Sequence, residues 1–157
     1  MSTIRNIVVA GLGGQGVLKV TDILAEAVFR SGFDVKKSEV HGMSQRGGSV
    51  SSEVRYGESV ASPMVPAGEA DVLAVLDATQ VDVAKAVLKA DGVLITPEDL
   101  PLDKLQNPKA LNTMMLGAVS NYVDIPVEIL LEALKANLPE KLHEMNVEMF
   151  NLGRDSR

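Results

Sequence analysis

Residues 4–17 read IRNIVVAGLGGQGV, a short apolar run followed at once by four glycines within six residues. The run from Ile4 to Ala10 predicts a buried strand. The glycines stand at positions 11, 13, 14 and 16, the G-x-G-x-x-G spacing of a tight turn between a strand and a helix. Only glycine lets the backbone turn so sharply and lets another backbone or an anion approach closely. This stretch therefore predicts the first strand–turn–helix unit of an α/β fold.

The next half of the chain, residues 17–96, continues the alternation of helix and strand. Val17 to Arg30 has apolar side chains on one helical face and charged ones on the other, and it ends at Ser31-Gly32. Further strands are predicted at 33–40, 50–56, 70–76 and 92–96, with a helix at 79–90. Because half of segment 50–56 is polar, we expect it at a sheet edge. The alternation favours a mostly parallel sheet covered on both faces.

The C-terminal third is predicted to be helical. Pro97 to Pro108 is expected to be a surface connection, and helices are then predicted at 112–122, 126–137 and 139–152, the last closed by Gly153. Residues 154–157 are expected to be frayed. The sequence thus predicts one Rossmann-like, doubly wound domain over residues 1–157.

Composition narrows the function classes. The 157 residues are 46% hydrophobic and 23% charged, as in a globular domain, and no stretch approaches the roughly 18 apolar residues of a membrane helix. A net charge of -6 and 3% aromatic residues argue against nucleic-acid binding. The absence of cysteine excludes disulfides and Cys-ligated zinc or iron–sulfur clusters within this chain. The N-terminal apolar run is too short for a signal peptide, so a cytoplasmic location is expected.

The glycine turn has three possible roles: tight helix–strand packing, contact with an anion or cofactor, or docking against another protein. The helix start after it offers free N–H groups to an anion. Glu39 follows Gly16 by 23 residues, near where a dinucleotide-binding fold places its ribose-binding acid. Gln15 is expected to present an exposed amide at the crest of the turn.

A second glycine-rich loop is predicted at residues 41–49, which read HGMSQRGGS. The guanidinium of Arg46 suits a carboxylate or phosphate, although a solvated arginine is the alternative. In an open α/β sheet both loops would leave the carboxyl ends of strands, where ligand crevices form. We therefore expect one contact surface built from Gly11, Gly13, Gly14, Gln15 and Gly16 of the first loop and Ser44, Gln45, Arg46, Gly47 and Gly48 of the second.

No catalytic or metal-binding residue is predicted. His41 and His143 lie about a hundred residues apart, and no carboxylate pair or Ser/His/Asp set has a useful spacing. His143 is expected on a solvated helix face, and His41 beside the second loop. Asp77 is expected to cap the turn into the next helix. Core filling is the expected role of Met114, Met115, Met145 and Met149.

Four segments together resemble a known family: GLGGQG, HGMSQRGGSVSSEVRYG, LNTMMLGAVSNYVDIPVEIL and EMNVEMFNLG. They are similar to the gamma subunit of 2-oxoacid:ferredoxin oxidoreductases, and MSQRGG is most similar to the beta subunit of indolepyruvate oxidoreductase. The resemblance covers roughly residues 4–153. The family has a longer segment where this chain has only Pro97 to Leu111.

The resemblance implies an accessory subunit of a complex that converts a 2-oxoacid, such as an arylpyruvate, and coenzyme A into acyl-CoA, carbon dioxide and reduced ferredoxin. It implies thiamine diphosphate, Mg and iron–sulfur clusters on the catalytic partner subunits, because this chain lacks cysteine and a Gly-Asp-Gly…Asn pattern. The two loops would then face the partner near its thiamine and coenzyme A sites, with Gln15 and Arg46 supplying polar contacts.

Two alternatives remain open at this stage. A freestanding NAD(P)-binding module would hold a pyrophosphate on Gly11 to Gly16 and a ribose near Glu39 or Arg46. A structural interaction protein would bind no ligand of its own. The isolated chain is also expected to be able to form a homodimer through an otherwise buried docking surface.

Overall fold

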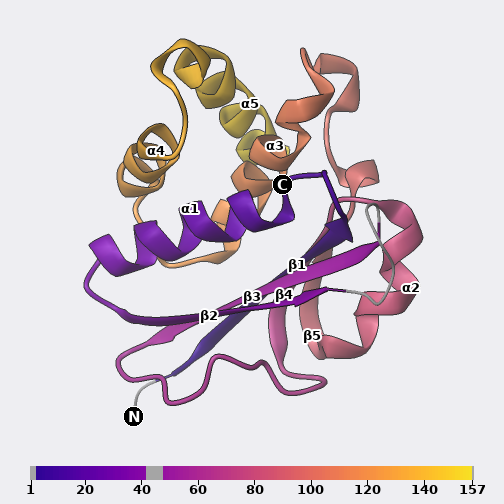
Figure 1. Ribbon diagram of the computed structural model, residues 1–157, viewed down its shortest axis with the longest axis vertical. Coiled ribbons are helices and arrows are strands. Elements are labelled where there is room, and N and C mark those ends of the chain that lie inside the picture. The colour runs from indigo at the N-terminus through magenta and orange to yellow at the C-terminus, as the bar shows by residue number, and fades with distance from the viewer. Residues whose placement is uncertain (1–2, 42–47, 157) are drawn as a thin grey trace.

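The computed structural model describes residues 3–41 and 48–156, apart from the side chain of His41. Five strands form one sheet in the order β2-β3-β1-β4-β5 (Figure 1). Their bounds are β1 (Arg5–Leu12), β2 (Asp34–His41), β3 (Ser49–Gly57), β4 (Ala70–Val75) and β5 (Leu88–Ile95). The pairs β1–β4 and β4–β5 are parallel, whereas β3 is antiparallel to both β1 and β2. The sheet is therefore mixed rather than mostly parallel by pairing, although β1, β2, β4 and β5 share one direction.

Strand β3 lies inside the sheet, so its predicted edge position is wrong. Its polar side chains alternate with buried ones, and the connection from 58 to 69 supplies their partners. Glu53 accepts a hydrogen bond from the backbone of Val65 at 2.9 Å. Arg55 donates to the carbonyls of Ser62 and Met64, each at 2.9 Å. The alternation of polar and buried residues in β3 thus reflects the loop that covers this strand, not an exposed edge of the sheet.

Helices cover both faces of the sheet, as predicted (Figure 1). The helices α1 (Val17–Arg30), α3 (Leu111–Val119), α4 (Val127–Ala136) and α5 (His143–Asp155) lie on one face, and α2 (Val81–Ala84) lies on the other. Alternate residues of β1 enter two separate cores, with Ile7 and Val9 on the α1 side and Val8 and Ala10 on the α2 side. The α/β class and the helical C-terminal third are confirmed.

The predicted helix at 79–90 is much shorter in the structure. Two 3-10 turns, Ala78–Gln80 and Lys85–Val87, flank α2, and β5 begins at Leu88. The pairing of β4 with β5 is irregular between Ala70 and Val72. A Cβ at Gly92 would lie 2.9 Å from the Ala70 carbonyl oxygen. Gly92 is thus a site of close strand approach inside β5, which begins four residues before the predicted start at residue 92.

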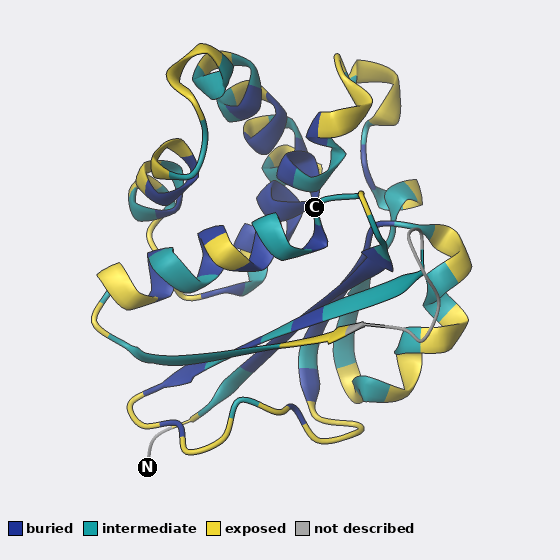
Figure 2. Cartoon of the chain, viewed as in Figure 1, coloured by how far each residue is buried: buried dark blue, intermediate teal, exposed yellow. Residues whose placement is uncertain are grey.

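The last helix does not end at Gly153, which corrects a second prediction. Helix α5 continues to Asp155 and thus includes Arg154 and Asp155. Arg154 also donates a hydrogen bond to the Ser120 hydroxyl at 2.7 Å. Figure 2 shows the helix that α5 crosses, α3, buried over most of its length, from Thr113 to Val119. Among the described helices, none combines the length and apolarity needed to cross a membrane.

Candidate functional site

The two predicted loops meet at one rim of the sheet. Strands β1 and β2 both run antiparallel to β3, so their carboxyl ends lie at the same edge. The backbone N–H of Gly13 donates to the carbonyl of Gly48 at 2.9 Å, and Leu12 pairs with Ser49 in the sheet. The predicted adjacency is therefore confirmed for Gly13 and Gly48. The other candidates of the second loop, Ser44, Gln45, Arg46 and Gly47, lie outside the described residues.

Gln15 does not present a free amide, which corrects the prediction for this residue. Its side-chain oxygen accepts a hydrogen bond from the backbone N–H of Leu12 at 2.7 Å. Its side-chain nitrogen donates to Asp77 Oδ2 at 2.9 Å. Gln15 thus closes the glycine turn from within and ties it to the end of β4.

Asp77 gives the base of the turn a negative charge. As predicted, it caps the turn into the next helical segment, accepting from the Thr79 N–H at 3.0 Å and from the Thr79 hydroxyl at 2.5 Å. The Thr79 hydroxyl, the Thr79 N–H and the Gln15 amide together lower the pKa of Asp77 below its ordinary value. The carboxylate is therefore ionised at neutral pH and disfavours a phosphate beside it.

Asn112, at the start of α3, is a site residue that sequence reasoning missed. Gly16 caps α1 in a left-handed conformation, with φ of 84°, and no side chain caps the helix. The Asn112 amide nitrogen lies 3.4 Å from the Gly16 carbonyl oxygen, and a Cβ at Gly16 would overlap the Asn112 side chain. The only signal in the sequence was the polar pair Asn112-Thr113 at the start of an apolar helix.

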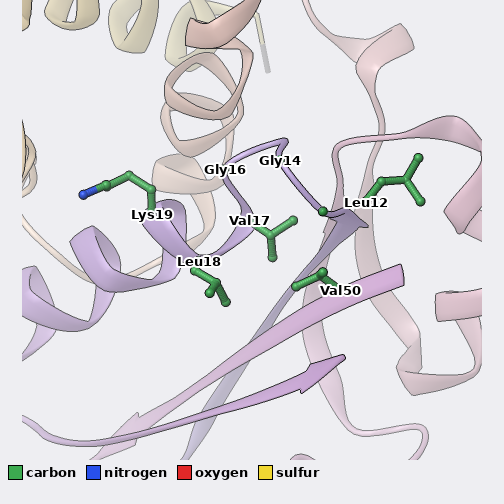
Figure 3. A pocket seen from close by; sticks show the side chains of 8 residues that line it. Leu12, Gly14, Gly16, Val17, Leu18, Lys19 and Val50 are labelled. Carbon is green, nitrogen blue, oxygen red and sulfur yellow. The ribbon is translucent and has the colours of Figure 1, made fainter. Parts of the chain in front are cut away.

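A cavity of about 320 Å³ opens beside the turn (Figure 3). Its walls are mostly apolar, and Lys19 extends away from it along α1 (Figure 3). The lining residues are Leu12, Gly13, Gly14, Gly16, Val17, Leu18, Lys19 and Val50. Backbone N–H groups of the helix start thus adjoin an apolar wall. Such a site suits an apolar group with a polar acceptor better than a pyrophosphate.

A second apolar hollow lies on the α2 face near the same rim. Two adjoining cavities of about 350 Å³ each share Val40, Ser51, Val83 and Ala84. Val40 is 52% exposed and Val83 is 66% exposed, which is unusual for valine in a folded chain. The rim therefore has apolar hollows on both sides of the sheet.

The remaining candidates are occupied within the chain. Glu39 lies 2.8 Å from Lys37 Nζ, which also pairs with Asp22 of α1. A ring nitrogen of His143 lies 2.8 Å from the Leu138 carbonyl in a half-buried position, so the expected solvated face is wrong. Core packing is confirmed for the buried Met114, Met115 and Met149 and for Met145 beside them. Over residues 3–41 and 48–156, no three acidic or histidine side chains are grouped to hold a metal ion.

Comparison with known proteins relates nearly the whole chain to one family. Residues 6–156 match the family model described as pyruvate ferredoxin/flavodoxin oxidoreductase. The chain is 31% identical to indolepyruvate oxidoreductase subunit IorB of Thermococcus kodakarensis, covering 94% of this chain and 93% of the relative. It is 28% identical to pyruvate synthase subunit PorC of Methanothermobacter thermautotrophicus, covering 88% and 87%.

The fold also matches a solved structure throughout. The gamma subunit of a keto/oxoacid ferredoxin oxidoreductase from Geobacter sulfurreducens is 25% identical and superimposes with a TM-score of 0.82 over 97% of both chains. The alignment with IorB of Thermococcus kodakarensis spans 188 positions, more than the 157 residues present here. The relative therefore has residues that this chain lacks.

Proposed function

The chain belongs to the pyruvate ferredoxin/flavodoxin oxidoreductase family, and we propose that it is the accessory, gamma-type subunit of a complex that oxidatively decarboxylates a 2-oxoacid with coenzyme A. An arylpyruvate such as indolepyruvate is the substrate class we favour. The support is the share of this chain that the relatives match, 94% for a protein named as an indolepyruvate oxidoreductase subunit against 88% for one named as a pyruvate synthase subunit. Identity does not separate the two classes, because a common gamma subunit of pyruvate/ketoisovalerate oxidoreductases is 32% identical and the indolepyruvate oxidoreductase subunit 31%.

The observation that carries this proposal is the hydrogen bond between Gly13 and Gly48. It ties the first glycine loop to Gly48, the residue before β3, at a rim with apolar hollows on both faces of the sheet. We infer that the rim contacts a catalytic partner subunit near its cofactor, with Arg46 as a polar contact, and that the isolated chain dimerises through the same surface.

The cofactors of the reaction are assigned to partner chains. The chain has no cysteine to ligate iron–sulfur clusters. The sequence also lacks a Gly-Asp-Gly…Asn pattern of the kind that binds Mg with thiamine diphosphate. Both features support the assignment of these groups to partner chains. Ferredoxin would receive electrons from the partner's clusters, in the cytoplasm.

The rival function, a freestanding NAD(P)-binding module, has weaker support. A pyrophosphate on the glycine turn would lie near the ionised Asp77 and the apolar walls of the adjoining cavity. Glu39, the candidate ribose ligand, is paired with Lys37. Both features oppose a dinucleotide at this turn.

Reconstitution tests the proposal. The chain is combined with the thiamine-containing partner from the same cells, and reduction of a dye is followed with an arylpyruvate and coenzyme A. We expect turnover to require this chain, to fall with Arg46→Ala and to persist with the exposed control Arg30→Ala. Full turnover without the chain, or micromolar binding of NAD(H) by the chain alone, would contradict it.

A further inference from the structure

A line of polar side chains leads from the glycine turn into the C-terminal helices. Asn112 contacts the Gly16 carbonyl, and the next residue, Thr113, donates its hydroxyl to Asn146 Oδ1 at 2.7 Å. The Asn146 amide in turn donates to the Leu142 carbonyl at 2.9 Å. Thr113 is 4% exposed and Asn146 is 5% exposed. Buried polar groups that satisfy one another hold their elements in one arrangement.

The orientation of the Asn112 amide is set by its own helix. Asn112 Oδ1 accepts a hydrogen bond from the backbone N–H of Thr113 at 2.9 Å. The amide must therefore turn its NH₂ group, a donor only, toward the Gly16 carbonyl. The side chain also fills the space that a Cβ at Gly16 would need.

Helix α3, which carries Asn112, is held in place by its crossing with α5. A Cβ at Gly117 would overlap the backbone of Phe150, so α3 and α5 cross with their backbones in near contact. Sliding or rotating α3 would separate this crossing and break the bond between Thr113 and Asn146. The crossing of α3 with α5 thus fixes the position of Asn112. The glycine turn is also held by the hydrogen bond from Gln15 to Asp77.

We propose that Asn112 is a positioning residue, which keeps the glycine turn in the one conformation that the catalytic partner subunit meets. The part of this inference that concerns the partner rests on the proposed function. The effect of Asn112 on the turn does not depend on it. Asn112 acts through the Gly16 carbonyl and through contact with the Gly16 Cα, so its loss affects the turn rather than the fold. Its role requires an amide donor at position 112.

Hydrogen exchange and partner titration of the full chain test it together. Asn112→Ala and Asn112→Asp both remove the donor, and Asn112→Asp keeps the acceptor for the Thr113 N–H. The matched control is Asn137→Ala, which removes an amide that donates to the Ala133 carbonyl at the end of α4. For both variants at position 112, exchange of amides 11–17 should rise about three- to tenfold, as expected for one hydrogen bond. The melting temperature should match that of the control.

The affinity for the partner should fall by a similar factor, and turnover at saturating subunit should recover. Exchange at 11–17 that stays at the wild-type rate, or rises equally throughout the chain, would overturn the inference. A wild-type exchange rate in Asn112→Asp would overturn it too, because the donor would then be dispensable. If the wild-type chain does not bind the partner, the proposed function fails, and exchange alone decides the role of Asn112.

Discussion

Gly153 of α5 lies so close to Met114 of α3 that a Cβ at position 153 would overlap the Met114 carbonyl group. Gly117 makes the reciprocal approach to the backbone of Phe150. Both glycines lie within helices, where glycine is otherwise unfavourable by about 1 kcal/mol relative to alanine. The close helix crossing therefore offsets a cost in helix propensity.

The first prediction follows from this crossing. Gly153→Ala should lower the free energy of unfolding by about 1–3 kcal/mol, because the added methyl group forces the two helices apart. Urea denaturation measures the effect, with Asn151→Ala on the exposed side of α5 as the control. A stabilised Gly153→Ala variant would mean that helix propensity outweighs the crossing.

The second prediction separates backbone conformation from contact at the glycine turn. Gly14, Gly16 and Gly32 have φ values of 89°, 84° and 93°. A Cβ would meet nothing within 4 Å at Gly14 and Gly32, but it would overlap Asn112 at Gly16. Alanine at Gly14 or Gly32 should therefore cost about 1–2 kcal/mol in thermal or urea unfolding, and alanine at Gly16 clearly more. Equal losses at all three positions would show that Asn112 yields freely.

The third prediction concerns a buried hydroxyl pair between α1 and β3. The hydroxyls of Thr21 and Ser52 lie 2.7 Å apart and both side chains are fully buried. Thr21→Val should lower the free energy of unfolding by about 1–3 kcal/mol, because the Ser52 hydroxyl loses a partner. A double-mutant cycle with Ser52→Ala should give a coupling of at least about 0.5 kcal/mol. Additive losses would show that the two hydroxyls do not stabilise each other.

The fourth prediction is a pH dependence from Asp77. Its pKa is lowered from 3.8 in the folded chain, chiefly by the Thr79 hydroxyl. The unfolded chain then binds the proton more readily, so the contribution of Asp77 is complete above pH 3.8 and is lost as the pH falls through the lower folded value. Unfolding free energies measured from pH 7 to pH 2.5 should therefore decline less in Asp77→Asn than in the wild type.

Thr79→Ala provides the matched test of the cause. It removes the hydroxyl bond and leaves the carboxylate, so its acid dependence should lie between those of the wild type and Asp77→Asn. If the unfolding free energies of all three proteins fall equally toward low pH, the pH dependence does not arise from Asp77.

The sequence predicts local elements well where one pattern dominates. Helix α1 has the predicted bounds, Val17–Arg30, because its apolar stripe and its terminating glycine agree. The glycine turn is also in its predicted place. The predictions failed where a distant segment decides the outcome. Arg55 donates a hydrogen bond to the connection after β3. Gly153 allows α5 to cross α3 closely and does not end the helix.

The same distinction applies to the site. The meeting of Gly13 and Gly48 followed from sheet geometry, because strands of one direction end at one edge. Gln15 donates to Asp77, which is 62 positions away in the sequence. Asn112 contacts Gly16, which is 96 positions away. No local pattern specifies such pairs, so only the folded chain reveals them.

The placement of α3 and α5 bears on how the protein is made. Most of the helical layer on the α1 face of the sheet, namely α3, α4 and α5, comes from residues beyond 110, and the brace on the glycine turn comes from Asn112. A nascent chain that has left the ribosome only as far as β5 has its strands but neither this layer nor the brace. Under the proposed function, the surface that meets another subunit is then complete only when most of the chain has been synthesised, which favours finished chains in assembly.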